Sequence, residues 1–260
     1  MNIVVLVKQV PDTAAERTLS GTDHRLDRED TDLVLDEINE RAAEEALTLK
    51  ETTDAEVTVV SMGPDSALDA IRKVLAMGAD RGIHICDDRL RGADVVTTAK
   101  VLAAAVRTVA DVDLVLAGNA TTDGQASAVP AVVADLLGLP QLTHVRELAV
   151  DAGRVRAERE TESGEATLEA PLPALVSVTE KINEPRYPSF KGIMAAKKKP
   201  VATVDLDDLF PDADDSVFLV TRTRVTEAVP RPARATGTLV KDDGSAARRL
   251  FEHLVAQKLV

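Results

Sequence analysis

Blocks of apolar and polar positions along the first 140 residues predict strands and helices in turn. Short runs rich in β-branched residues are typical of strands covered on both faces, and they occupy residues 2–7, 57–60, 82–85 and 114–117. Between these runs, apolar residues recur three or four positions apart, which is the spacing of an amphipathic helix. Strands that alternate with helices build a parallel sheet with right-handed crossovers. The pattern therefore predicts the body of a doubly wound α/β fold.

The pattern changes after Pro140. Two strand-like stretches, 145–150 and 154–159, flank the turn sequence Asp-Ala-Gly, which predicts an antiparallel hairpin. Residues 166–170 are expected to add a third strand to it. Residues 174–179 are again strand-like, and we expect them to return to the main sheet. The hairpin region 145–170 is thus an addition to a mostly parallel sheet.

The chain is expected to become irregular from Pro200, with a helix only at 245–259. Sixty residues of this composition cannot form their own core, yet they contain large apolar side chains, namely Phe210, Phe218, Leu219 and Phe251. Arms of this kind are usually ordered by packing on a partner. We therefore predict an α/β domain at residues 1–200 and, at residues 201–260, an extended arm and C-terminal helix that pack on a partner subunit.

The composition narrows the possible functions. The net charge of −13 argues against nucleic acid as a partner. A single cysteine excludes a disulfide within the chain and suits a reducing compartment. No apolar run reaches the length of a membrane span, and the first apolar residues lead straight into Lys8. We expect a cytoplasmic protein without membrane insertion.

Residues typical of catalysis are scattered. None of the four histidines, His24, His84, His144 and His253, has a partner at metal-ligand spacing, so no metal site is expected. There is no Gly-x-Ser-x-Gly motif, and Cys86 follows a strand, where a packed small hydrophobe is the simpler interpretation. The chain is not expected to be an enzyme with its own active site.

The best candidate for a binding site is the loop Gly118–Gln125, with the sequence GNATTDGQ. It follows a predicted central strand, and ligands of open α/β sheets bind outside the carboxyl ends of strands. Glycine permits close backbone approach, the threonines offer hydroxyl groups, and the following helix presents free N–H groups to an anion. The alternative is an ordinary polar connection with Asp123 as a helix cap. The residues alone leave both interpretations open.

A second unusual segment is Ile182–Lys199, with the sequence INEPRYPSFKGIMAAKKK. It contains the only tyrosine, Tyr187, one of the four phenylalanines, Phe190, and a basic run in an acidic chain. Rings concentrated in a loop with proline and glycine indicate a contact surface. The alternative, in which the rings fold back onto the domain's own core, stays open at this point.

Several of these motifs resemble the beta subunit of electron-transfer flavoprotein. The resemblance rests on MGADRGIH at 77–84, on Leu-Ala-Gly at 116–118 with Asp123 beyond, and above all on Asn-Glu-Pro-Arg-Tyr at 183–187 with Ile193-Met194. It covers nearly the whole chain to about Lys199. It implies a doubly wound fold of the adenine-nucleotide-binding type and a heterodimer that carries electrons. In that family the alpha subunit holds most of the FAD, and the beta subunit binds AMP in a structural role and docks on flavin dehydrogenases.

The resemblance also implies functional positions. AMP contacts would fall at Leu6, Asp36 and Met62 and, in the loop 118–129, at Gly118, Asn119, Thr121, Thr122, Asp123, Gly124, Gln125, Ser127 and Val129. Residues 183–199 correspond to the dehydrogenase-docking segment, with contacts expected at Tyr187, Phe190, Ile193 and Met194. Glu160 matches a glutamate that reaches an arginine of the flavin domain.

Four positions depart from the family pattern. Asp36 stands where animal members have asparagine, and Ala128 where many members have glutamine. Thr13 and Ile38 replace aromatic residues that lie near the flavin in animal members. Some members carry a second FAD in place of AMP, and the sequence leaves open which ligand this chain takes, as it does the identity of the dehydrogenases and of the quinone-reducing or other acceptor.

Two other classes of protein share features with this sequence. A stand-alone adenine-nucleotide-binding module of the stress-protein type shares the doubly wound core, but the hairpin, the docking segment and the long arm count against it. A self-contained enzyme such as a nucleotide α-hydrolase is disfavoured by the lack of a Gly-rich pyrophosphate loop and of a nucleophile.

Overall fold

The computed structural model describes residues 1–29, 31–161, 163–211, 221, 223–229, 231–234, 237 and 239–260. The chain divides into two compact units, Met1–Thr226 and Glu227–Val260. The first contains the whole sheet and the candidate sites.

A nine-stranded sheet forms the centre of the first unit, counted over the described residues. Its strand order is β11-β5-β4-β1-β6-β10-β7-β8-β9. Seven of these strands run parallel, and their bounds are β11 Val201–Val204, β5 Arg81–Ile85, β4 Glu56–Met62, β1 Asn2–Val7, β6 Val112–Gly118, β10 Ala174–Val178 and β7 Gln141–Asp151. The predicted α/β fold with a mostly parallel sheet is confirmed, as is the return of residues 174–178 to that sheet.

Side chains of β1 explain why its sequence is continuously apolar. Ile3, Val5 and Val7 belong to one buried cluster, whereas Val4 and Leu6 belong to a second cluster on the other face. Successive side chains of a strand point to opposite faces, so a strand covered on both sides is apolar at most positions.

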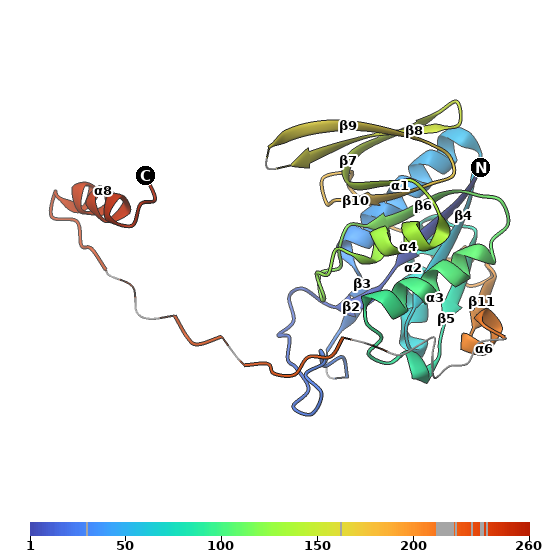
Figure 1. The fold of residues 1–260 in the computed structure, drawn as a ribbon, viewed down its shortest axis with the longest axis horizontal. Helices are drawn as coiled ribbons and strands as arrows, with labels where there is room; N and C mark the ends of the chain where they lie inside the picture. The colour runs from blue at the N-terminus through green and yellow to red at the C-terminus, as the bar shows by residue number, and fades with distance from the viewer. Residues whose placement is uncertain are drawn as a thin grey trace. The chain divides into compact units, whose positions relative to one another are not determined.

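Helices cover both faces of the sheet (Figure 1). The cluster that contains Ile3 is covered by α1 Glu37–Thr53, α2 Leu68–Met77 and α5 Phe190–Ala196. The cluster that contains Val4 is covered by α3 Val95–Arg107, α4 Val129–Leu137 and the short α6 Leu206–Leu209. Two 3-10 turns, Asp65–Ala67 and Asp88–Leu90, and a small antiparallel pair, β2 Gln9–Pro11 with β3 Leu33–Leu35, complete the described elements of this unit.

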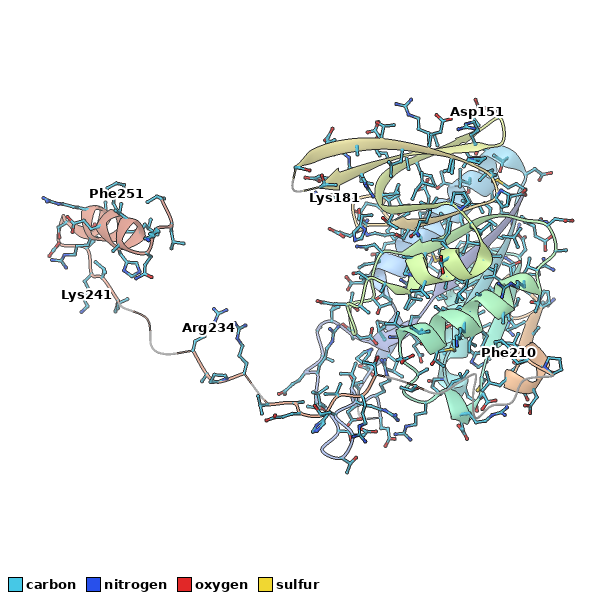
Figure 2. All side chains as sticks on the ribbon, viewed as in Figure 1. Asp151, Lys181, Phe210, Arg234, Lys241 and Phe251 are labelled. Carbon is cyan, nitrogen blue, oxygen red and sulfur yellow. The ribbon has the colours of Figure 1, made fainter. Side chains whose placement is uncertain are left out.

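The predicted antiparallel addition is present. Strand β8, Arg154–Thr161, pairs antiparallel with β7 and with β9, Gly164–Pro171. The turn after Asp151 has left-handed backbone at Ala152 and Gly153 (Figure 2), as a tight hairpin requires.

The prediction that the chain is irregular from Pro200 is wrong for residues 201–209. Val201–Val204 forms the edge strand β11, which pairs parallel with β5. Leu206 is buried below α3, and Asp205 caps α6 with a reciprocal hydrogen-bond pair. Strand β11 has only four residues, and such a short run is not distinctive in sequence.

The second unit contains helix α8, Ala246–Ala256, within the predicted helical stretch. Leu250, Phe251 and Val255 on this helix are exposed within the chain. Phe218 and Leu219, which the sequence analysis assigned to the arm, lie outside the described residues. Among the described helices, none has the length and apolar character that crossing a membrane requires.

Candidate functional site

The order of the parallel strands reverses between β1 and β6. From β1 the chain builds β4 and β5 on one side and then crosses to β6 on the other. The carboxyl ends of β1 and β6 therefore adjoin at the position where doubly wound folds bind ligands. Lys8 follows β1, and the loop 118–129 follows β6, so the predicted loop lies at this switch point.

Asp36 ties this loop to helix α1. Its buried carboxylate accepts hydrogen bonds from the backbone N–H groups of Ile38 and Asn39 at 3.1 Å, which caps the helix. The other carboxylate oxygen accepts the N–H of Thr122 at 2.7 Å. One side chain thus satisfies donors of two segments far apart in sequence, so Asp36 serves as a structural link between them.

Gly118 permits the close approach of the loop to α1. A Cβ atom at this position would lie 2.4 Å from the side-chain nitrogen of Asn39, and real side chains do not tolerate such a contact. Asn39 in turn donates to the carbonyl of Ala120 at 3.5 Å. Glycine is therefore required at the end of β6 for packing against α1.

Asp123 is a buried carboxylate with two cationic partners. Lys8 Nζ lies 2.8 Å from one of its oxygens, and Arg28 forms a second ion pair with the same oxygen. Thr121 and the N–H of Gly124 donate to the other oxygen, each at 2.7 Å. Burial alone would raise the pKa of Asp123, but Lys8, together with Arg28 and Thr121, holds this pKa well below its usual range. Asp123 is thus an ionised anchor for the loop, with no capping bond to α4.

Three cations from residues 8–28 surround the loop. Besides Lys8 and Arg28, Arg17 donates from its guanidinium to the carbonyl of Thr122. None of these three residues was among the predicted site residues. The position of Lys8 directly after a central strand was a usable signal, whereas Arg17 and Arg28 contact Thr122 and Asp123 across about a hundred positions of sequence.

The backbone of residues 125–129 has an unusual shape. Gln125 and Ser127 have φ values of 48° and 52°, in the left-handed region that non-glycine residues rarely adopt. Helix α4 then begins at Val129 with no side-chain capping bond at Ala128. The buried Asn119 Oδ1 and Thr122 Oγ1 lack partners in the described structure. Strained backbone and unsatisfied polar atoms of this kind are concentrated at ligand sites.

The remaining predicted nucleotide positions are apolar and share one side of the sheet. Leu6 is part of the cluster below α3 and α4, and Met62 and Val129 pack against that cluster. Each stands at or near the carboxyl end of a strand or the start of α4. The structure therefore places the apolar positions on the face of the sheet that α3 and α4 cover. Asp36 lies at the start of α1, which covers the opposite face.

The four predicted docking side chains are exposed. Tyr187 is 96% and Phe190 81% exposed, and Ile193 and Met194 on the same short helix, α5, are about half exposed. Their rings and chains do not enter the core, which excludes the alternative that they fold back onto it. Among the residues that the structure describes, the segment instead presents these apolar side chains at the surface.

Glu160 lies at the far end of the antiparallel addition. Its carboxylate is half exposed and pairs at 2.5 Å with Lys181, which is labelled in Figure 2. The hydrogen bond from Lys181 lowers the pKa of Glu160. Glu160 is thus separate from the loop 118–129 in the sheet order and reachable by another protein.

His84 and Cys86 lie beside the ends of strands, in structural positions. His84 is buried and its Nε2 lies 3.1 Å from the carbonyls of Gly63 and Pro64 in the turn after β4. Cys86 follows β5, and burial is the largest of the effects that raise the pKa of its thiol. Over the described part of the chain, no group of three His, Cys, Asp or Glu side chains has a metal-binding arrangement.

Comparison with known proteins identifies the family. The profile described as "ETF: Electron transfer flavoprotein domain" matches residues 24–209. "Electron transfer flavoprotein subunit beta" of Mycobacterium tuberculosis is 50% identical over 100% of this chain and 99% of that protein. The proteins of the same name from Megasphaera elsdenii and Thermoanaerobacterium thermosaccharolyticum are 34% and 35% identical over the full length of both chains. The chain therefore belongs to the electron transfer flavoprotein family, among its beta subunits, and is a protein of electron transport.

Proposed function

We propose that this chain is the beta subunit of a heterodimer that accepts electrons from flavin dehydrogenases and passes them on. In this proposal the chain binds AMP at the switch point, shares FAD with an alpha subunit that holds most of it, and docks dehydrogenases through residues 183–199. The observation that carries the proposal is the loop 118–129, a strained polar loop at the switch point with Lys8, Arg17 and Arg28 around it.

The residues at the switch point suit an adenine nucleotide. Lys8, Arg17 and Arg28 supply positive charge for a phosphate, although Lys8 and Arg28 are partly neutralised by Asp123. The start of α4, without a side-chain cap, adds backbone N–H groups and a positive dipole end. Met62 and Val129, which are partly buried, offer apolar surface for the purine ring, and Leu6 lies buried in the cluster against which they pack.

FAD requires a second subunit in this proposal. When bound, FAD supplies the redox chemistry. The five aromatic residues of the chain lie away from the switch point in sequence: Tyr187 and Phe190 in the docking segment, Phe210, Phe218 and Phe251 beyond it. None of the five lies within the sequence of β1, β6 or the loop 118–129, so these segments themselves supply no ring to stack on an isoalloxazine ring. The relatives are named "subunit beta", which supports the proposal that an alpha subunit covers the isoalloxazine ring.

The docking segment and Glu160 complete the proposal. The exposed apolar side chains at Tyr187, Phe190, Ile193 and Met194 form the kind of patch that marks a protein contact. Because of the family resemblance, we propose that flavin dehydrogenases bind this patch. Glu160, held beside Lys181, is proposed to meet the flavin domain of the alpha subunit.

The test is to purify the chain together with its alpha subunit, record a visible spectrum, and extract the nucleotides. We expect a yellow complex that releases one equivalent each of FAD and AMP on denaturation. Two equivalents of FAD without AMP would replace the AMP assignment by a second flavin. A colourless monomer that releases adenine nucleotide would instead indicate a stand-alone nucleotide-binding module.

A further inference from the structure

The base of the docking segment is held to helix α1 by one carboxylate. Glu44 accepts from Arg186 at both oxygens: Nε donates at 2.9 and 3.0 Å, and Nη2 donates at 2.9 Å. The backbone N–H of Arg186 donates to Glu44 as well, at 3.0 Å. This side chain of Glu44 is only 9% exposed. Forked pairs of this kind are the most directional ion pairs in proteins.

Neighbouring contacts support the same attachment. Asn183 donates to the carbonyl of Arg41 at 3.1 Å and to Glu45 at 3.0 Å, and Arg41 donates to the carbonyl of Asn183. The hydrogen bond to Glu44 is the largest of the effects that raise the pKa of the Arg186 guanidinium, and the hydrogen bond to Glu51 is the next. The chain is therefore attached to α1 immediately before Tyr187.

The other end of the segment is attached to helix α2. Arg72 donates to the carbonyls of Ala196 and Lys199 at 2.8 and 3.0 Å. Lys199 donates to the carbonyls of Leu75 and Ala79. The exposed apolar side chains thus lie between two attachments on different helices.

We propose that Glu44 is a positioning residue for docking: through Arg186 it holds the docking segment so that Phe190 is presented to a dehydrogenase. Glu44 itself is buried and does not touch the partner. Without the pair, residues 183–189 would sample other backbone conformations, and docking would have to order them again. The inference rests on the proposed function of this segment.

The variant Glu44→Gln keeps the shape of the side chain but removes the charge that Arg186 faces. In the FAD-containing heterodimer, with a purified flavin dehydrogenase that reduces the wild-type protein as the probe, we expect KM for the flavoprotein to rise about tenfold. We expect kcat, flavin content and extracted nucleotide to stay unchanged. Hydrogen exchange should rise in residues 183–194 and stay unchanged in β1.

The matched control is Glu51→Gln. Glu51 also pairs with Arg186, but it makes one contact and its side chain is 60% exposed, so KM should change less than twofold. If Glu44→Gln does not fold, Arg186→Lys, which keeps the charge but loses the fork, is tested in the same way.

Combination with Phe190→Ala separates positioning from other effects. If Glu44 acts by presenting Phe190, then Glu44→Gln should add little to the KM of the Phe190→Ala variant. Additive effects, or wild-type docking by Glu44→Gln, would overturn the inference while leaving the proposed function intact. Wild-type docking by Phe190→Ala would instead overturn the docking surface, and the positioning role with it.

Discussion

At the scale of single residues, the candidate site depends on a buried charge whose partners come from elsewhere in the chain. Asp123 is ionised because Lys8 and Arg28 face it and because Thr121 and the N–H of Gly124 donate to it. Removing one partner of a buried ion pair leaves the others without compensation, which usually costs more than the pair contributes net. Asp123 therefore determines the shape of the loop. It also determines how much of the positive charge of Lys8 and Arg28 is left for a ligand.

The variant Asp123→Asn should lower the free energy of unfolding by about 1–3 kcal/mol at neutral pH, because it removes a charged acceptor with four donors. The folded pKa of Asp123 lies below its ordinary value of 3.8, so its contribution is complete above about pH 4 and is lost as the pH falls further. Denaturant unfolding at several pH values checks this. The surface variant Asp23→Asn is the control, and a difference between Asp123→Asn and wild type that persists undiminished at pH 2 would contradict the argument.

Gly124 permits a clean test of the nucleotide loop. A Cβ atom there would meet only Thr121 Oγ1, at 4.0 Å, so Gly124→Val should fold without a clash inside the chain. We expect the extracted nucleotide to fall well below one equivalent, because the added side chain blocks close backbone approach. Gly21→Val, at another open glycine, is the control. A full equivalent of nucleotide in Gly124→Val would show that the ligand does not contact this loop.

At the scale of elements, α5 combines a firm attachment with an exposed outer side. Gly192 permits this, since a Cβ atom there would lie 2.3 Å from the carbonyl of Ala76 on α2. The inner side of the helix therefore presses on α2, and Ala196 is buried. Phe190 and Met194 consequently remain outside and available for contact.

Phe190→Ala should weaken dehydrogenase docking by about ten- to a hundredfold, because burying a phenylalanine ring contributes about 1.5–3 kcal/mol. Since the ring is exposed in this chain, thermal stability and the flavin spectrum should stay nearly unchanged. Val96→Ala is the matched control: Val96 is an exposed apolar residue on α3, which covers the other face of the sheet. A stability loss of about 3 kcal/mol or more in Phe190→Ala would mean that the ring is buried in its own domain.

At the scale of the whole molecule, large apolar side chains are exposed in both units. In the second unit, α8 exposes Leu250, Phe251 and Val255, and in the first unit the docking segment exposes Tyr187 and Phe190. Exposed apolar patches of this kind indicate protein contacts. We therefore expect the alpha subunit to cover the exposed apolar side chains of α8.

The chain expressed alone should be colourless and should be cleaved by proteases within residues 227–260. Both properties should reverse when the alpha subunit is added with FAD, because that subunit is proposed to cover both the flavin and the arm. Titration of the isolated chain with FAD, followed by limited proteolysis with and without the alpha subunit, checks this. Tight binding of one equivalent of FAD by the isolated chain, with reduction by an electron donor, would favour a self-contained flavoprotein instead.

The sequence by itself determined the elements whose signal is local. The apolar runs predicted β1, β4, β5 and β6, because strands covered on both faces are mostly apolar. Asp36 caps the start of α1 and Gly138 the end of α4, and both residue types are typical of these positions, since caps depend on a few neighbouring residues. The motif Asn-Glu-Pro-Arg-Tyr at 183–187 indicated the family. The loop 118–129 was located because it directly follows the predicted strand 114–117.

Only the tertiary structure decided which distant residues meet. Lys8, Arg17 and Arg28 reach the loop across about a hundred positions, and Arg186 reaches Glu44 across 142. Strand β11 was missed for the same reason, because its four residues become a strand only when the edge of β5 offers them partners. Caps and alternation are encoded within one turn or one strand, whereas ion pairs and edge strands depend on where the chain returns after folding. That return is determined by the packing of the whole sheet, and no short window of sequence contains it.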